Sequence, residues 1–391
     1  MIKAISLTFA LLALTFLRSS AEFNATALYD HYSGLDSKQL LEIGVGLDSR
    51  QSADSALVCY TVVADRLRHN LSTPENQAWL AHALNNIGYI YGNFFCSYKE
   101  SMAYFDEALE IAVRYKLPRY IAYAHLNKGG IYSTLTRIYG KRLFLEEARN
   151  ELSACVSTAI EVKDWKIALV SILNMGMLYF DNGDFTPIER AMKLVSESDI
   201  SASLPLYKYV QAYYAGLSAY SRRDYRLALA SFKTMASIDP KYPVLDDRLE
   251  FLPATALAET YSAMGDNQEA ISITLSVIKN LEGKPKMADD MLQAYSMLSR
   301  FYNLARQESQ SVVWRDRYYR EKDSILSENE VVGMKIAPIT AALEEVKQNL
   351  EQEEIRHRNM STVAMIVVVA LLLVSALAVV IAIKTSISTP S

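Results

Sequence analysis

The sequence has few of the residues that interrupt helices or cross-link chains. Its 391 residues include 14 glycines, 10 prolines and three cysteines. So little glycine and proline favours long helices over short strands joined by tight turns. The cysteines, Cys59, Cys96 and Cys155, lie far apart, and each falls in a helical pattern. We therefore expect small buried side chains rather than a disulfide framework or a metal site.

Signatures of catalysis and of nucleic-acid binding are also missing. The sequence contains no phosphate-binding glycine loop, dinucleotide fingerprint, zinc-protease helix motif or nucleophile elbow. Its formal net charge of −4 differs from the basic footprint that nucleic-acid binding requires. We therefore expect a protein that is not an enzyme and has no cofactor, no metal and no nucleic-acid partner. The 51% of apolar residues still allows a large buried core.

What the sequence does contain is a repeated helical unit. The pattern N-x-G-x-x-Y occurs at Asn86–Tyr91, Asn127–Tyr132 and Asn174–Tyr179. Looser copies continue the register, with successive register residues 40 to 47 positions apart, at Gly88, Gly129, Gly176, Gly216, Ala258 and Ser299. A period of this size indicates stacked helical hairpins, because one hairpin cannot bury its apolar face alone.

The clearest unit, residues 214–240, contains two helical patterns separated by a polar turn. The second pattern places apolar residues at i, i+4 and i+7, and a proline ends it. This unit resembles a tetratricopeptide repeat (TPR), with matches at Gly216, Tyr225, Ala228, Phe232 and Pro240. The resemblance implies an all-α fold, a TPR-like α-solenoid. We expect about seven hairpins over residues 22–325, with degenerate units at the ends because their outer faces meet water.

Apolar segments lie near both ends of the sequence. Residues 1–21 combine a charged start, an apolar run and small residues, as secretory signal peptides do; an uncleaved anchor is the alternative. Residues 361–383 are long and apolar enough to cross a lipid bilayer, so we expect a transmembrane helix there. Residues 384–391 would then form a short cytoplasmic tail.

Residues 326–360 are expected to form a helical stalk between the array and the membrane. Their apolar positions fit about two heptads, at Ile336, Ile339, Leu343, Val346 and Leu350. This spacing favours a short coiled coil and a parallel homodimer through residues 336–350. A single solvated helix is the alternative, and Pro338 should interrupt its start.

This order of segments resembles bacterial membrane-anchored TPR sensors and regulators. The resemblance implies a location in the bacterial inner (cytoplasmic) membrane, with the repeat array on the exported, periplasmic side. In those proteins a DNA-binding or kinase domain usually follows the membrane helix, and we expect neither here because only Lys384–Ser391 remains. Arg356 and Arg358 on the exported side conflict with the positive-inside rule. A tail-anchored cytosolic protein is the alternative topology.

The predicted ligand-binding residues lie on the first helices of the hairpins, which line the concave face of TPR-like arrays. Asn86, Asn127 and Asn174 occupy one position in three consecutive units. An asparagine offers both a donor and an acceptor to a peptide backbone. Aromatic neighbours add contact area at low entropic cost; they are His82, Tyr89, Tyr123, Tyr213, Tyr214 and Tyr220. Alternatively, the asparagines bridge adjacent hairpins and hold the array in shape.

Two functions fit these features. The first is a membrane-anchored, non-catalytic scaffold that binds a peptide or protein partner on its concave face. The alternative is a sensor that transmits binding through the stalk and membrane helix to a separate signalling or transcription-regulating partner. The sensor hypothesis depends on the lack of a Gly- or Ser-rich linker between the array and the stalk.

Overall fold

The computed structural model describes residues 29, 31–48, 52–140, 142–241, 250–282 and 288–324, which contain helices and turns but no strand. Most of these residues belong to long helices: α3 (Ser37–Asp48), α4 (Ala53–Arg68), α5 (Pro74–Asn93), α6 (Tyr98–Arg114), α7 (Pro118–Tyr139), α8 (Arg142–Glu161), α9 (Trp165–Asn182), α10 (Thr186–Ser196), α11 (Pro205–Ser221), α12 (Tyr225–Ala236), α13 (Phe251–Ala263), α14 (Asn267–Leu281) and α15 (Ala288–Leu304). A further helix covers residues 308–324.

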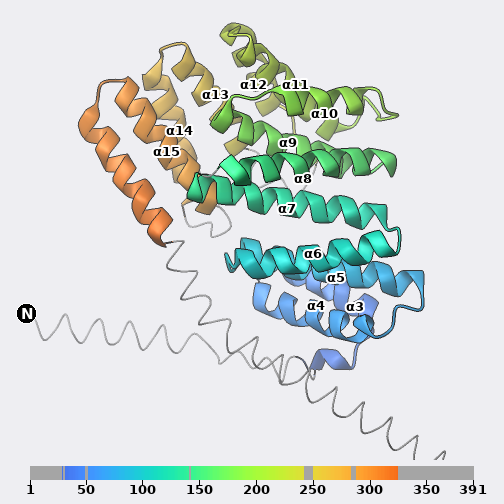
Figure 1. Ribbon diagram of the computed structural model, residues 1–391. Helices are drawn as coiled ribbons and strands as arrows, with labels where there is room; N and C mark the ends of the chain where they lie inside the picture. The colour runs from blue at the N-terminus through green and yellow to red at the C-terminus, as the bar shows by residue number, and fades with distance from the viewer. Residues whose placement is uncertain are drawn as a thin grey trace, which may run out of the picture. The chain divides into compact units, whose positions relative to one another are not determined.

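In the described part of the chain, consecutive helices pair into six hairpins, from α3 with α4 through α13 with α14, and a seventh follows them (Figure 1). The seventh pairs α15 with the helix over residues 308–324, where Tyr295 packs against Trp314. The second helix of each hairpin contacts the first helix of the next, as α4 does with α5 and α6 with α7. First helices of neighbouring hairpins also touch, as α5 does with α7. The predicted all-α array of about seven stacked hairpins is confirmed.

Glycines of the repeat lie where another helix approaches closely. A Cβ atom built on Gly129 would lie 2.7 Å from the Leu152 side chain of α8. A Cβ on Gly216 would overlap the ring of Phe232, which is fully buried on α12. Each hairpin of this kind therefore closes around one bulky side chain that fits only because the facing residue has no side chain.

Two of the turns inside hairpins combine a left-handed residue with a capping aspartate. Arg223 and Gly265 have φ values of 62° and 90°. The next residues, Asp224 and Asp266, each accept a hydrogen bond from the backbone amide three positions on. Such caps satisfy an amide that has no partner inside the helix. The polar turn expected within residues 214–240 is confirmed, although an arginine rarely adopts this backbone conformation.

The seventh hairpin also packs against α7, far away in sequence (Figure 1). Ile138 of α7 and Leu292 of α15 are both 1% exposed and share a small apolar cluster with Tyr98 and Tyr318. The Tyr318 hydroxyl donates a hydrogen bond to the backbone carbonyl of Arg137, at 3.2 Å. We call these four side chains the clasp. The clasp connects the last hairpin directly to the third.

The cysteines match the prediction only in part. Cys59 and Cys155 are buried, and burial raises the pKa of their thiols, to about 11 and about 12. Cys96 was expected inside a helix, but it lies in the turn between α5 and α6 with a φ of 51° and is partly exposed. None of the three forms a disulfide.

The predicted signal peptide (1–21), stalk (326–360), membrane helix (361–383) and tail (384–391) lie outside the described residues. Among the helices that are described, none combines the length and the apolar character needed to cross a bilayer. The array expected over residues 22–325 is described from residue 29 to residue 324.

Replacing Gly216 by alanine should destabilise the array, because the new methyl group would overlap the Phe232 ring. Overpacking of this kind costs about 1–3 kcal/mol. Urea denaturation followed by circular dichroism measures the loss. The double variant Gly216→Ala/Phe232→Leu should lose less stability than the two single variants lose in sum, since leucine leaves room for the methyl group. A Gly216→Ala protein as stable as the wild type would contradict this packing.

Candidate functional site

Asn86 and Asn127 lie on the side of their helices that faces away from the hairpin partner. On α7, Gly129 faces α8, and Asn127 precedes it by two positions, roughly 200° around the helix. On α5, Gly88 faces Phe105 of α6, and Asn86 has the same offset. Asn86, Asn127 and Asn174 are all partly exposed. The structure therefore leaves the three predicted side chains accessible.

One face of α7 carries residues that lie three or four positions apart and are all partly exposed: Tyr120, Tyr123, Asn127, Gly130 and Thr134. The equivalent face of α5 is also accessible and carries Trp79, His82, Asn86, Tyr89 and Asn93. We call these two faces together the polar stripe. Helices α5 and α7 are the first helices of neighbouring hairpins, and they contact each other.

The asparagines of the ladder do not hydrogen-bond to neighbouring hairpins. Asn86 donates to the backbone carbonyl of His82 on its own helix, at 2.9 Å. Within the described part of the chain, the side chains of Asn127 and Asn174 have no hydrogen-bond partner. This argues against the alternative in which the ladder bridges adjacent hairpins, and it leaves the amide of Asn127 available to a ligand.

A row of aromatic rings crosses the polar stripe from one helix to the next. Tyr60 of α4 lies 6.5 Å from His82, and His82 lies 6.1 Å from Tyr120, between ring centroids. Tyr120 lies 6.5 Å from Tyr123, whose ring is 5.8 Å from the guanidinium of Arg119. Burial and the charge of Arg119 lower the pKa of His82, which favours its neutral imidazole.

Tyr120 is a member of this row that the sequence analysis missed. It precedes Asn127 by seven positions, the same spacing that separates Trp79 from Asn86 on α5. Seven residues make about two helical turns, so both rings return to the face that carries the asparagine. The recurrence of this spacing in two units is the signal that could have found Tyr120.

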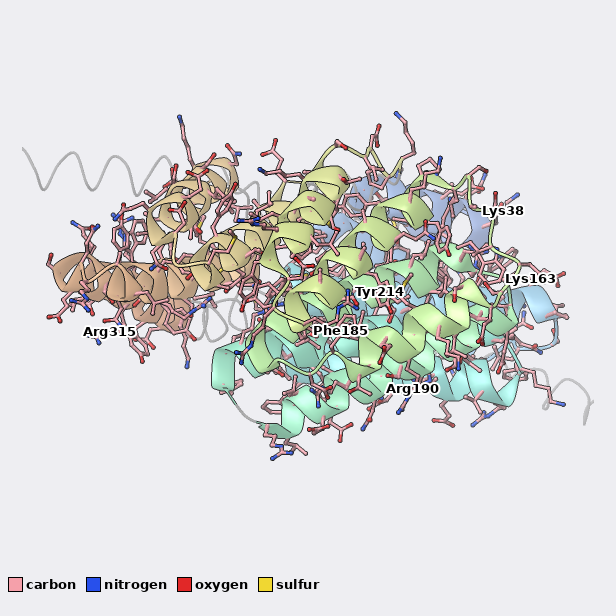
Figure 2. The ribbon with its side chains drawn as sticks, turned by 90° about the horizontal axis from the view of Figure 1, so that it is seen from above. Lys38, Lys163, Phe185, Arg190, Tyr214 and Arg315 are labelled. Carbon is pink, nitrogen blue, oxygen red and sulfur yellow. The ribbon has the colours of Figure 1, made fainter. Side chains whose placement is uncertain are left out.

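The predicted tyrosines of α11 do not extend the stripe. Tyr213 is 1% exposed and its ring fills the space beside Gly176, so its predicted ligand contact is wrong. Tyr214 stacks on Phe185 with ring centroids 5.6 Å apart, and the two lie together in Figure 2. Tyr220 packs against three other aromatic rings, and burial raises its pKa to about 12. Ligand contact by Tyr214 or Tyr220 stays a prediction.

The stripe becomes apolar beyond α7. The residue after the repeat glycine is partly exposed on α5 and α7, where it is Tyr89 and Gly130. On α9 and α11 it is Met177 and Leu217, which are 5% and 0% exposed. At this position of the repeat, the residue is therefore accessible on α5 and α7 and buried on α9 and α11, although Asn174 of α9 is partly exposed.

Gly130 is an unusual member of the stripe. It lies in the middle of α7, and a Cβ atom built on it would meet no atom within 4 Å. A glycine inside a helix is about 0.5–1 kcal/mol less favourable than an alanine. No packing requirement in the part of the chain that the structure describes accounts for this residue.

A charged cluster holds a different side of α7. The Lys128 ammonium lies 2.9 Å from carboxylates of both Asp106 on α6 and Glu151 on α8. His125 Nδ1 lies 2.6 Å from the Glu151 carboxylate. Burial alone would raise the pKa of Glu151, but the bonds with His125 and Lys128 outweigh it and lower that pKa. The cluster fixes α7 between α6 and α8, and so sets which of its residues face outward.

These contacts also separate the two histidines of the first helices. His82 belongs to the aromatic row, whereas His125 bonds to Glu151. Across the described residues, no group of three or more histidine, cysteine, aspartate or glutamate side chains could hold a metal ion. The site offers amides, hydroxyls and ring surfaces, which suit recognition by hydrogen bonding and packing.

Comparison with solved structures finds, among others, the crystal structure of a tetratricopeptide repeat protein from Parabacteroides merdae ATCC 43184. The two chains are 15% identical, the match covers 76% of this chain and 98% of that one, and the TM-score is 0.44. No protein-family model and no curated protein matches the sequence. The architecture described above therefore rests on the helices and contacts of this chain.

Proposed function

We propose that this chain is a non-catalytic binding scaffold whose polar stripe takes a peptide segment of a protein partner. Asn127 is the observation that carries this proposal. Its amide is partly exposed, has no hydrogen-bond partner in the described structure, and lies between Tyr123 and Gly130 on one face of α7. A face that presents such an amide beside aromatic rings is suited to binding.

The chemistry of the stripe matches that of a peptide chain. A side-chain amide carries N–H donors and a C=O acceptor, the same groups that each peptide bond presents. Asn86 and Asn127 occupy equivalent positions on two helices that touch, so an extended segment crossing both could bond to each in turn. The rings of His82, Tyr120 and Tyr123 would cover the side chains of such a segment.

The triple variant Asn86→Ala/Asn127→Ala/Asn174→Ala should lose peptide binding. The probe is the tightest binder from a displayed random dodecapeptide library, selected on the full-length wild-type chain and labelled with fluorescein. Each lost hydrogen bond is worth about 0.5–1.5 kcal/mol, so affinity by fluorescence anisotropy should fall about tenfold or more.

The matched control is Asn150→Ala, which removes an exposed asparagine from α8, outside the stripe. This variant should bind the probe as the wild type does, and both variants should keep the wild-type circular dichroism spectrum. Unchanged affinity of the triple variant would remove the asparagine ladder from the binding site.

The proposal includes anchoring of the array on the periplasmic side of a bacterial inner membrane through residues 361–383. The uncharged, apolar run in this segment and the signal-like composition of residues 1–21 support it. Membrane attachment would also concentrate the chains in one orientation, which favours a parallel dimer through residues 336–350.

Full-length chain expressed in bacteria should stay with carbonate-washed membranes, whereas a chain ending at residue 360 should be released.

Single cysteines replacing Leu343 or Val346, in a chain without native cysteines, should form disulfide-linked dimers in those membranes. A cysteine replacing Glu345 should do so much less, because it lies off the proposed seam. Release of the full-length chain by carbonate would refute the anchor, and equal trapping at all three positions would refute the seam.

A sensor is the second candidate, and the clasp favours it. Helix α7 carries the ligand-facing residues Tyr123 and Asn127, and its last turn contacts α15 and the helix over residues 308–324 through Ile138 and Arg137. That last helix precedes the predicted stalk along the chain. Ligand bound to α7 could therefore shift the clasp and the segment that follows it. Such a shift requires that the ligand prefer one of two clasp arrangements.

Binding of the dodecapeptide probe should then change backbone hydrogen exchange in the helix over residues 308–324 of the wild type. The variant Leu292→Ala/Tyr318→Phe weakens the clasp. When this variant is saturated with the probe to the same degree, hydrogen exchange in that helix should not change. Mass spectrometry of the full-length chain measures both. If the probe changes exchange only around α5 and α7 in the wild type, the array is a passive scaffold.

A further inference from the structure

The surroundings of Gly130 set it apart from other helical glycines in the array. A Cβ atom would collide with a neighbouring side chain at Gly88, Gly92, Gly129, Gly176 and Gly216. Each of these five glycines therefore makes room for packing inside the fold. At Gly130 the same atom would enter open space. Within the described part of the chain, nothing uses the room that its missing side chain leaves.

Equivalent positions on other first helices carry large side chains. They are Tyr89 on α5, Met177 on α9 and Leu217 on α11. Helix α7 alone among these four leaves the position empty, at the cost of a residue that weakens helices. The gap adjoins the residues that carry the proposed function. Asn127 lies three positions before Gly130, and Tyr123 lies seven positions before Gly130. All three share one helix face.

We propose that Gly130 is where the main chain of a bound, extended peptide crosses α7. The proposal rests on the scaffold function above and specifies which part of the ligand meets which part of the stripe. Because Gly130 has no Cβ atom, a ligand backbone can approach α7 more closely there than at any other residue type. At that distance the Asn127 amide can pair with the N–H and the C=O of one ligand peptide unit.

The neighbours of the gap favour a main chain over an inserted side chain. Asn127 and Thr134 lie one turn before and one turn after Gly130 on the same face, and both are polar. An apolar side chain inserted there would meet an amide and a hydroxyl-bearing residue, whereas a peptide backbone offers hydrogen bonds to such groups. Tyr123, two turns before Gly130, would cover the next part of the ligand.

The test compares Gly130→Ala with the wild-type full-length chain, using the selected dodecapeptide as the probe. Because alanine is the better helix former and meets no neighbour, Gly130→Ala should raise the melting temperature by about 1–3 °C. The same methyl group would push the ligand backbone away, so affinity should fall about tenfold. Gly130→Leu, a longer side chain that also favours helix, should abolish binding without lowering the melting temperature.

The matched control is Ser153→Ala, which also improves helix propensity but lies exposed on α8. It should leave the affinity unchanged. A stabilised protein that binds worse is an outcome that misfolding does not produce. In the wild-type complex, N-methylation of the peptide should abolish binding at one or two adjacent residues, because it blocks the backbone that approaches the helix.

Other outcomes contradict the inference at separate levels. If Gly130→Ala and Gly130→Leu bind as the wild type does while the asparagine triple variant does not, the peptide crosses elsewhere and only this inference fails. If shortening one peptide side chain to alanine restores binding to Gly130→Ala, a ligand side chain occupies the gap and the main-chain crossing is wrong. If the library yields no binder, or the triple variant keeps full affinity, the proposed function itself fails.

Discussion

The fit of a bulky side chain against a residue without one is the interaction on which the rest of the array depends. Leu152 against Gly129 and Phe232 against Gly216 bring the two helices of a hairpin close enough to bury their apolar faces. In the hairpin of α9 and α10 the partner differs, since the ring beside Gly176 is Tyr213, which belongs to the next hairpin. The same small residue can therefore join helices within a unit or between units.

Helix α7 links the structural and the proposed functional parts of the molecule. Gly129 and the Lys128–Glu151 ion pair hold it against α8, and these contacts fix its rotation. Because its rotation is fixed, the face with Tyr123 and Asn127 points away from its hairpin partner. Its last turn takes part in the clasp. A ligand on this helix would thus contact an element that is tied to both the second hairpin and the seventh.

The division between stability and binding is visible along the first helices. On α9 and α11 the positions around the ladder are filled by buried side chains such as Met177 and Leu217, so these helices serve the core. On α5 and α7 the same positions stay accessible and carry amides and rings. The empty position at Gly130 lies in the accessible part, where a residue that weakens the helix has no structural benefit.

The sequence by itself determined the hairpins, because the N-x-G-x-x-Y pattern and the apolar spacing are local and repeat along the chain. It also placed Asn86, Asn127 and Asn174 at one position of three successive units. From the sequence, Tyr213 and Tyr123 had the same predicted role, and the packing of the Tyr213 ring against Gly176 of another helix buries one of them. The repeat pattern placed Gly129 in the register, but only the structure shows that Gly129 meets Leu152 while Gly130 faces open space. The clasp joins residues that are far apart in sequence, so only the tertiary structure decided it.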